Sequence, residues 1–253
     1  MLRLKRLAVL SLFAFCAITG LAFWLPGMAG SGMPDADMRH AAPPQAAGKF
    51  VPLGSGSTHA VNITRTVDPG WLARTAVRTG IPARALRAYV AAAGAANEAA
   101  PACRMGWNTV AAVGFVESKH GALGGGRLTA SGEVTGPIVG PGLNGEGFAA
   151  IADTDGGALD GDPRWDRAVG PMQFIPSTWK LAGQDANGDG VADPHNIDDA
   201  ALSAAGYLCA GGRDLTSAQG WSDAIWSYNQ SGAYLSQVGG KAVEYAEQAG
   251  PDK

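Results

Sequence analysis

The stretch that decides the fold is Trp107–Gly121, with the sequence WNTVAAVGFVESKHG. Its apolar side chains would cover most of the circumference of a helix instead of one stripe, which is typical of a helix buried on nearly all sides. Asn108 or Thr109 suits the N-cap, and Gly121 suits the position just beyond the last turn. We therefore predict a central helix of about three turns, around which the other helices pack.

Glu117 stands near the end of this apolar helix. Burial disfavours the ionised carboxylate, and so does the negative end of the helix dipole, so both raise the pKa of Glu117 toward the range of a general acid. The competing interpretation is an ordinary boundary residue, at which Glu117 meets solvent and pairs with Lys119 or another cation.

Composition indicates one helical domain with appendages. The chain has 253 residues, 46% of them hydrophobic and 16% charged, which suffices for a proper core. A content of 37 Gly and 15 Pro, with no strand-rich region, predicts a mainly α fold whose helices are joined by long Gly-rich loops. The net charge of −3, without a basic block beyond the extreme N-terminus, argues against nucleic acid as a partner.

The N-terminus is typical of an exported protein. A basic segment, Met1–Arg6, precedes an uncharged apolar run, Leu7–Leu25. This run either belongs to a signal peptide over residues 1–29 that is cleaved, or stays as a membrane anchor. Residues 30–66 have the composition of a disordered linker, and residues 67–250 should form the catalytic domain, in the cell envelope or secreted.

The cysteines predict one disulfide. Cys16 belongs to the apolar run, which leaves Cys103 and Cys209 as a single pair in an exported protein. Joined with His120 and His195, the pair could instead bind zinc, but no CxxC or HxxxH spacing supports that site.

The segment Asp185–Asp193, DANGDGVAD, matches the opening of an EF-hand loop. The oxygen ligands would be Asp185, Asn187, Asp189, the backbone carbonyl of Val191, and Asp193. Position 12 holds Asn196 where the bidentate Glu is expected, unless Asp198 or Asp199 reaches in. Spacing favours a structural calcium ion, and the alternative is a Gly/Asp turn without an ion.

The connection Gly121–Asp162 is long and rich in glycine, and a loop of this length is typically functional or disordered. Leu128–Val134 could form a small hairpin about Ser131-Gly132. The aspartates near its end are either a solvated acidic turn or a second carboxylate or cation ligands facing a cleft. They are Asp153, Asp155, Asp160 and Asp162.

Three ordered motifs, within Pro101–Ser236, resemble the bacterial lytic transglycosylases of the soluble and membrane-bound type B group. They are Glu117-Ser118, the run GPMQFIPS at Gly170–Ser177, and Ser227-Tyr228-Asn229. The resemblance implies a lysozyme-like, mainly helical domain that cuts the β-1,4 bond between N-acetylmuramic acid and N-acetylglucosamine in peptidoglycan. It also agrees with a calcium loop, since such loops occur in the type B group.

The resemblance further implies that Glu117 is the single acid/base and that the product carries a 1,6-anhydro ring. Ser118 would hold Glu117 or a sugar group by a hydrogen bond. Met172 and Gln173 would line the cleft, whereas Phe174 and Trp179 belong to the core. Tyr228, with its phenol near Glu117, and Asn229 would bind the reacting sugar.

Two other functions remain open on the sequence. A hydrolysing muramidase would use Asp155, Asp160 or Asp162 as a second carboxylate that positions water. A module that binds the cell wall in a calcium-dependent manner, without catalysis, would depend on Asp185–Asp193 instead. The sequence indicates no organic cofactor.

Overall fold

The computed structural model describes residues 41–51, 66–146 and 149–250. The predicted signal peptide or anchor, 1–29, and its apolar run 7–25 lie outside the described residues. Within the described ranges, no helix combines the length and the hydropathy needed to cross a membrane.

The described chain is mainly α, as the composition predicts. Strand pairing in the same ranges is confined to isolated antiparallel bridges. The helices are α1 (Pro69–Thr79), α2 (Ala83–Ala99), α3 (Trp107–Ser118), α4 (Pro176–Ala182), α5 (Ile197–Cys209), α6 (Ala218–Tyr228) and α7 (Gly232–Ala249), with short 3-10 turns at Pro101–Cys103, Leu123–Gly125 and Ala210–Gly212.

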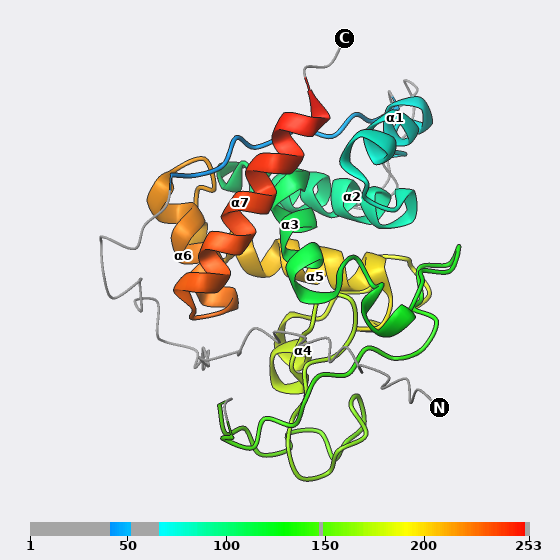
Figure 1. The fold of residues 1–253 in the computed structure, drawn as a ribbon, viewed down its shortest axis with the longest axis vertical. Coiled ribbons are helices and arrows are strands. Elements are labelled where there is room, and N and C mark those ends of the chain that lie inside the picture. Colours follow the sequence, from blue (N-terminus) through cyan, green and yellow to red (C-terminus); the bar gives the residue numbers. More distant parts are fainter. Residues whose placement is uncertain (1–40, 52–65, 147–148, 251–253) are drawn as a thin grey trace, which may run out of the picture.

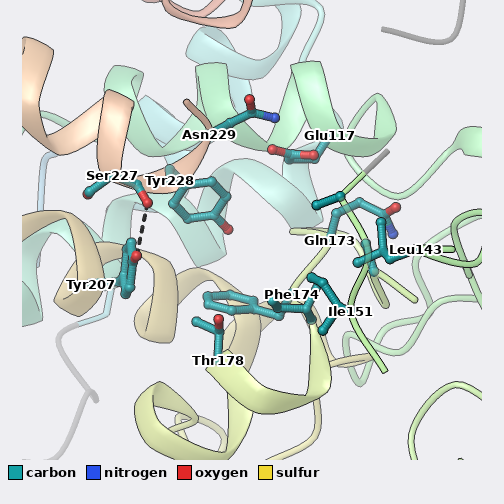
Figure 2. A pocket seen from close by; sticks show the side chains of 13 residues that line it. Glu117, Leu143, Ile151, Gln173, Phe174, Thr178, Tyr207, Ser227, Tyr228 and Asn229 are labelled. Carbon is teal, nitrogen blue, oxygen red and sulfur yellow. Dashed lines mark hydrogen bonds between the residues drawn. The ribbon is translucent and has the colours of Figure 1, made fainter. Parts of the chain in front are cut away.

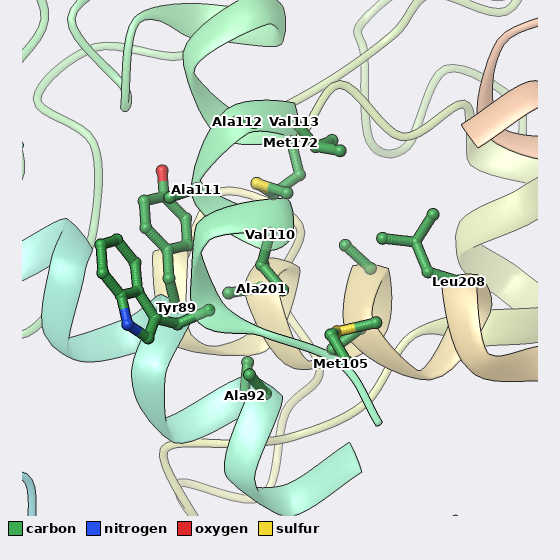
Figure 3. Close-up of a cluster of buried hydrophobic side chains, with 14 of the residues drawn as sticks. Tyr89, Ala92, Met105, Val110, Ala111, Ala112, Val113, Met172, Ala201 and Leu208 are labelled. Carbon is green, nitrogen blue, oxygen red and sulfur yellow. The ribbon is translucent and has the colours of Figure 1, made fainter. Parts of the chain in front are cut away.

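Helix α3 lies at the centre of the fold, as its apolar sequence predicts. It packs against α2, α5 and α7, and Figure 1 shows it among them. The side chains from Trp107 to Val113 are all buried, and Figure 3 shows several of them among residues of α2 and α5. The site at the end of α3 therefore rests on the best-packed element of the molecule.

The N-terminus of α3 is capped by a distant segment, which corrects two predictions. Gly106, and neither Asn108 nor Thr109, is the N-cap residue. The buried Asn108 side chain accepts a hydrogen bond from the Ala46 amide and donates to the Pro44 carbonyl. Gln45 Oε1 accepts from the Gly106 amide at 2.8 Å. Residues 41–51, which the sequence assigns to the disordered linker 30–66, thus lie against the domain and satisfy the free amides of this helix.

The C-terminus of α3 differs from the expected glycine cap. The helix ends at Ser118, and Lys119 and His120 both adopt left-handed backbone angles, with φ of 54° and 63°, before Gly121 at 83°. Positive φ costs Gly121 little, but at Lys119 and His120 it needs support from the surrounding structure. The His120 ring provides it by bonding to the phenols of Tyr89 and Tyr245 at 3.1 and 2.9 Å.

Cys103 and Cys209 form a disulfide, with their Cα atoms 5.4 Å apart. The bond joins the turn after α2 to the last residue of α5, across 106 residues of sequence. Both thiols are therefore engaged with each other and are not available to the zinc site considered above.

The connection from α3 to α4 extends away from the helices (Figure 1). Leu128 and Val134 pair in an antiparallel bridge, as predicted for the small hairpin. Further bridges join Val139 to Val169 and Ala152 to Trp165, so this long loop folds back on itself. It brings Leu143 and Ile151 to one side of the cleft described next.

Candidate active site

Glu117 faces a cleft between the helices and the long loop. The cleft has about 710 Å³ of space when its open mouth is counted. In Figure 2, Glu117, Tyr228 and Asn229 lie on one side of the cleft and Phe174 and Thr178 on the opposite side. The full lining is Glu117, Leu143, Ala149, Ile151, Ala168, Gln173, Phe174, Ile175, Thr178, Tyr207, Ser227, Tyr228 and Asn229.

The Glu117 carboxyl group has the environment of a general acid. Part of the side chain remains exposed at the cleft wall, yet the pKa of Glu117 is raised from 4.5 to about 7. Loss of hydration on burial is the main cause, and a hydrogen bond from Tyr234 opposes it by stabilising the ionised form. Near neutral pH the group can therefore both give and take a proton.

Tyr234 on α7 is the side chain that holds Glu117. Its phenol donates to Glu117 Oε1 at 2.5 Å, and the residue is 5% exposed. The sequence analysis missed this residue because Tyr234 lies outside the three motifs. A signal was present, because Ser231 caps α7 and places Tyr234 on the same inward face as Leu235 and Val238.

Gln173 reaches the cleft from a tight turn. Gln173 has a left-handed backbone, with φ of 52°, and its side-chain amide donates to the Gly170 carbonyl at 2.9 Å. The turn requires glycine at 170, where φ is 76° and a Cβ would lie 1.8 Å from the Pro194 carbonyl oxygen. Val169 and Phe174 pair across the turn and close it. No described residue donates a hydrogen bond to the Gln173 amide oxygen. This oxygen can therefore accept one from a ligand or from water.

Ser118 and Met172 support the site from beneath instead of lining it. Ser118 is 1% exposed, and its hydroxyl donates to the Pro171 carbonyl at 2.6 Å. That bond ties the end of α3 to the turn that carries Gln173. Met172 is fully buried in the core (Figure 3). Both residues were predicted to meet Glu117 or substrate, and both contact protein instead because they face the interior below the cleft.

Tyr228 lies in the cleft with Glu117, but its hydrogen bond goes elsewhere. The Tyr228 phenol donates to the Met172 carbonyl at 2.8 Å, which again ties a helix end to the Gln173 turn. Tyr228 and Glu117 line the same cleft, whereas the direct partner of Glu117 is Tyr234. Phe174 packs edge-on against Tyr228 and Trp179, in agreement with its predicted core role.

Asn229 offers a free acceptor beside Glu117. The residue is 6% exposed, and within the described ranges its Oδ1 atom has no hydrogen-bond partner. A buried acceptor without a partner is costly, so a donor from a ligand or water is expected to satisfy it. The amide N–H of an acetamido group is such a donor.

The loop aspartates lie outside this cleft. Among the described residues that line it, Glu117 is the only acid. Asp153 and Asp155 accept backbone hydrogen bonds within their own loop, and Asp162 binds Arg167 at 2.8 Å. Oxygens of Asp153, Asp155 and Asp166 lie within 4.8 Å of one another, without any further feature that indicates an ion.

The segment Asp185–Asp193 forms a compact loop with oxygen donors. Asp185 accepts from the amides of Gly188 and Gly190, at 2.7 and 2.8 Å. Asp199 reaches in from α5 and accepts from the Ala186, Asn187 and Asp193 amides, while Asp198 pairs with Arg84. Asn196, at position 12, instead caps α5. The donors present are carboxylate, amide and carbonyl oxygens, which suit a hard cation such as calcium.

Comparison with protein families identifies one match. The sequence model described as the transglycosylase SLT domain matches residues 160–222. This range contains the Gln173 turn, the Asp185–Asp193 loop, all of α5 and only the start of α6, and it stops short of Tyr228. It does not separate the membrane-bound type B group from the others. Neither the curated proteins nor the solved structures give a significant match.

Proposed function

We propose that this chain, which matches the transglycosylase SLT domain over residues 160–222 and has a mainly helical fold, is a peptidoglycan lytic transglycosylase with Glu117 as its single acid/base. The observation that supports this most is the environment of Glu117. Burial raises its pKa to about 7 in a cleft that the matched domain helps to line.

The proposed reaction uses the same carboxyl group twice. The neutral acid first donates its proton to the glycosidic oxygen as the bond from muramic C1 breaks, and the N-acetylglucosamine chain leaves with that proton. The resulting carboxylate then removes the proton from the muramic C6 hydroxyl while O6 bonds to C1. The products are a free hydroxyl on one chain and a 1,6-anhydro ring on the other, with Glu117 again neutral.

Neighbouring residues fit the two stages. The hydrogen bond from Tyr234 stabilises the carboxylate that exists between the two proton transfers. The side-chain amides of Asn229 and Gln173 belong to the cleft lining and would take the N-acetyl groups, and Tyr228 with Phe174 would form an aromatic wall for the sugar. Ser118 and Met172 would contribute indirectly, because they help to fix the position of the turn that carries Gln173.

Product mass separates this reaction from hydrolysis. Purified peptidoglycan should yield muropeptides one water lighter than the reducing products of a muramidase. Products that carry only reducing muramic ends would favour the hydrolysing alternative. Hydrolysis needs a second carboxylate, and the described residues that line the cleft include no second one. Single Asp155→Ala, Asp160→Ala and Asp162→Ala variants with full activity would further exclude a water-positioning aspartate.

A Glu117→Gln variant tests catalysis against binding. The amide keeps the size of the side chain but cannot donate an acidic proton, so digestion should stop while binding to the wall remains. If the variant digested peptidoglycan as well as the parent, the non-catalytic wall-binding module would be the better description.

We also propose a structural calcium ion in the Asp185–Asp193 loop. The ligands would be the side-chain oxygens of Asp185, Asn187, Asp189 and Asp193 with the carbonyl of Val191. The ion would hold the connection between α4 and α5 below the cleft, and no step of the reaction needs it.

Finally, we propose that the protein is exported, either secreted or held in the cell envelope by residues 7–25. The basic segment and the apolar run at the N-terminus support this proposal. The intact mass of the mature protein from whole cells, together with its distribution between membrane and soluble fractions, would distinguish cleavage near residue 29 from a retained anchor.

A further inference from the structure

A second hollow adjoins the Glu117 cleft. It has about 590 Å³ of space, counted to its mouth as for the cleft. It is lined by Val139, Asp160, Gly161, Asp162, Pro163, Arg164 and Arg167. We refer to it as the arginine pocket.

The acceptors in the arginine pocket are already used. Both oxygens of Asp160 accept backbone amides, those of Asp162 and Arg167. In Asp162, Oδ1 accepts the Arg164 amide and Oδ2 accepts the guanidinium of Arg167. Each of these four carboxylate oxygens therefore already accepts at least one hydrogen bond from the protein.

The donors, in contrast, remain available. Arg164 is exposed, and within the described residues its guanidinium forms no hydrogen bond or ion pair. Arg167 donates to Asp162 and to the Gly140 carbonyl, which leaves part of its five N–H groups free. Unused donors on two guanidinium groups favour an anion as the ligand, and a planar carboxylate matches the guanidinium best.

The wall between the two hollows includes the chain at Arg167 and Ala168. Neighbouring residues face opposite sides, with Arg167 in the arginine pocket and Ala168 in the cleft. Gly140 lies in this wall, donates to the Ala168 carbonyl at 2.8 Å, and accepts from Arg167. A Cβ at Gly140 would lie 3.3 Å from the Gln173 amide oxygen. The arginines therefore lie beside the cleft, on the other side of this wall.

We infer that the arginine pocket binds a free carboxylate of the peptide attached to the muramic acid whose bond is cut. This inference rests on the proposed function. The peptide branches from the sugar and carries carboxylates, and Val139, which is 37% exposed, offers an apolar surface for a small aliphatic side chain. The pocket would select peptide-bearing strands over bare glycan.

The test compares two substrates and two variants. Glycan strands of matched length, with their peptides intact or removed by an amidase, are digested by the parent, by Arg164→Gln and by Arg87→Gln. Arg87 is an exposed arginine on α2, outside both pockets, and serves as the matched control. Arg164 is preferred to Arg167 because Arg167 also holds Asp162.

Arg164→Gln should lower kcat/KM on peptide-bearing strands by about tenfold, the loss expected for a charge-assisted pair, and leave bare strands unchanged. Arg87→Gln should change neither. Arg164→Glu should cleave strands with amidated peptides better than strands with free carboxylates. Equal losses on both substrates, or no loss on either, would overturn the inference while leaving the proposed function intact.

A parent protein without activity on either substrate would instead defeat the proposed function. The pocket is then tested by binding alone, by titrating a muramyl tetrapeptide with free carboxylates and the same peptide fully amidated. Preference for the free acid that Arg164→Gln removes would support the pocket, and equal binding of both peptides would reject it. Melting curves of each variant show whether the fold is kept.

Discussion

The phenol of Tyr234 donates a hydrogen bond to Glu117 Oε1 at 2.5 Å, so helix α7 holds the carboxyl group that ends helix α3. The bond stabilises the ionised form and opposes the effect of burial. The two effects together keep the pKa of Glu117 near 7 instead of higher. This balance suits a group that must be acid and base in one turnover.

A Tyr234→Phe variant should show how much this hydrogen bond lowers the pKa of Glu117. Without the donor, the pKa of Glu117 should rise by about one unit, because the carboxylate loses a hydrogen bond to its charged form. Activity, which needs the neutral acid in the first step, would then persist to higher pH while its maximum falls. The pH profile of kcat measures both effects. A profile with an unshifted alkaline limb would contradict the assigned role of Tyr234.

Tyr207→Phe is the matched control. Tyr207 also lines the cleft, but its phenol donates to the Ser227 carbonyl at 2.9 Å and not to Glu117 (Figure 2). Its removal should leave the alkaline limb of the pH profile in place.

Glu117→Gln should be inactive yet more stable than the parent above pH 7. The folded-state pKa of about 7 exceeds the unfolded value near 4.5, so the folded protein binds the extra proton between these values. Parent stability should accordingly fall as the pH rises from about 4.5 to about 7, whereas the variant lacks this fall. We expect a gain of about 1–2 kcal/mol at pH 8, allowing for partial exposure.

Chemical denaturation of both proteins at pH 4 and pH 8 measures this difference. If the two stabilities ran parallel between these pH values, Glu117 would not be the desolvated acid described here.

Replacing both cysteines tests the disulfide. Cys103→Ala/Cys209→Ala should lower the free energy of unfolding by about 2–5 kcal/mol, because the bond closes a long loop in the unfolded chain and joins the turn after α2 to α5. The double variant leaves no unpaired thiol at this position. Thermal melts of the oxidised parent and the variant give the comparison, and equal melting temperatures would count against a stabilising bond.

The sequence predicts the elements of this fold whose signals are local. The apolar run of α3 marks a buried helix whatever packs against it, and the position of Glu117 near its end is visible in the order of the residues. The Gly170–Phe174 turn is equally local, since its glycine and its bridge lie within a few residues. The placement of Glu117 and Gln173 at one cleft came from the resemblance to the lytic transglycosylases and not from these local signals.

Contacts between distant segments could not be predicted in the same way. The partner of Glu117 is 117 residues further along the chain, and only the crossing of α3 and α7 selects Tyr234 over Tyr228. Ser118 is polar, as a residue that binds substrate would be. Its burial against Pro171, however, depends on where the Gly170–Phe174 turn packs against α3, which the sequence does not reveal. The sequence predicts Asn108 as a helix N-cap. In the structure its side chain instead forms a hydrogen bond with Ala46, in an N-terminal segment whose composition resembles a linker.

Calcium should stabilise the protein through the Asp185–Asp193 loop. Asp185 and Asp199 already gather the amides of this loop, so their like charges approach each other, and a bound cation would offset that repulsion. The melting temperature should therefore be higher in calcium than in chelator, and Asp185→Ala should remove the difference. Asp160→Ala is the control, because Asp160 also accepts two backbone amides in a loop but lies outside this segment.

Asp199→Asn distinguishes the ion from the scaffold. Asp199 receives three loop amides, so its loss should lower the melting temperature in calcium and in chelator alike. Magnesium should give a smaller effect than calcium, since it requires a tighter octahedral set of ligands than this open loop provides. Identical melts of the parent in calcium and in chelator would show that the hydrogen bonds of Asp185 and Asp199 hold the loop without an ion.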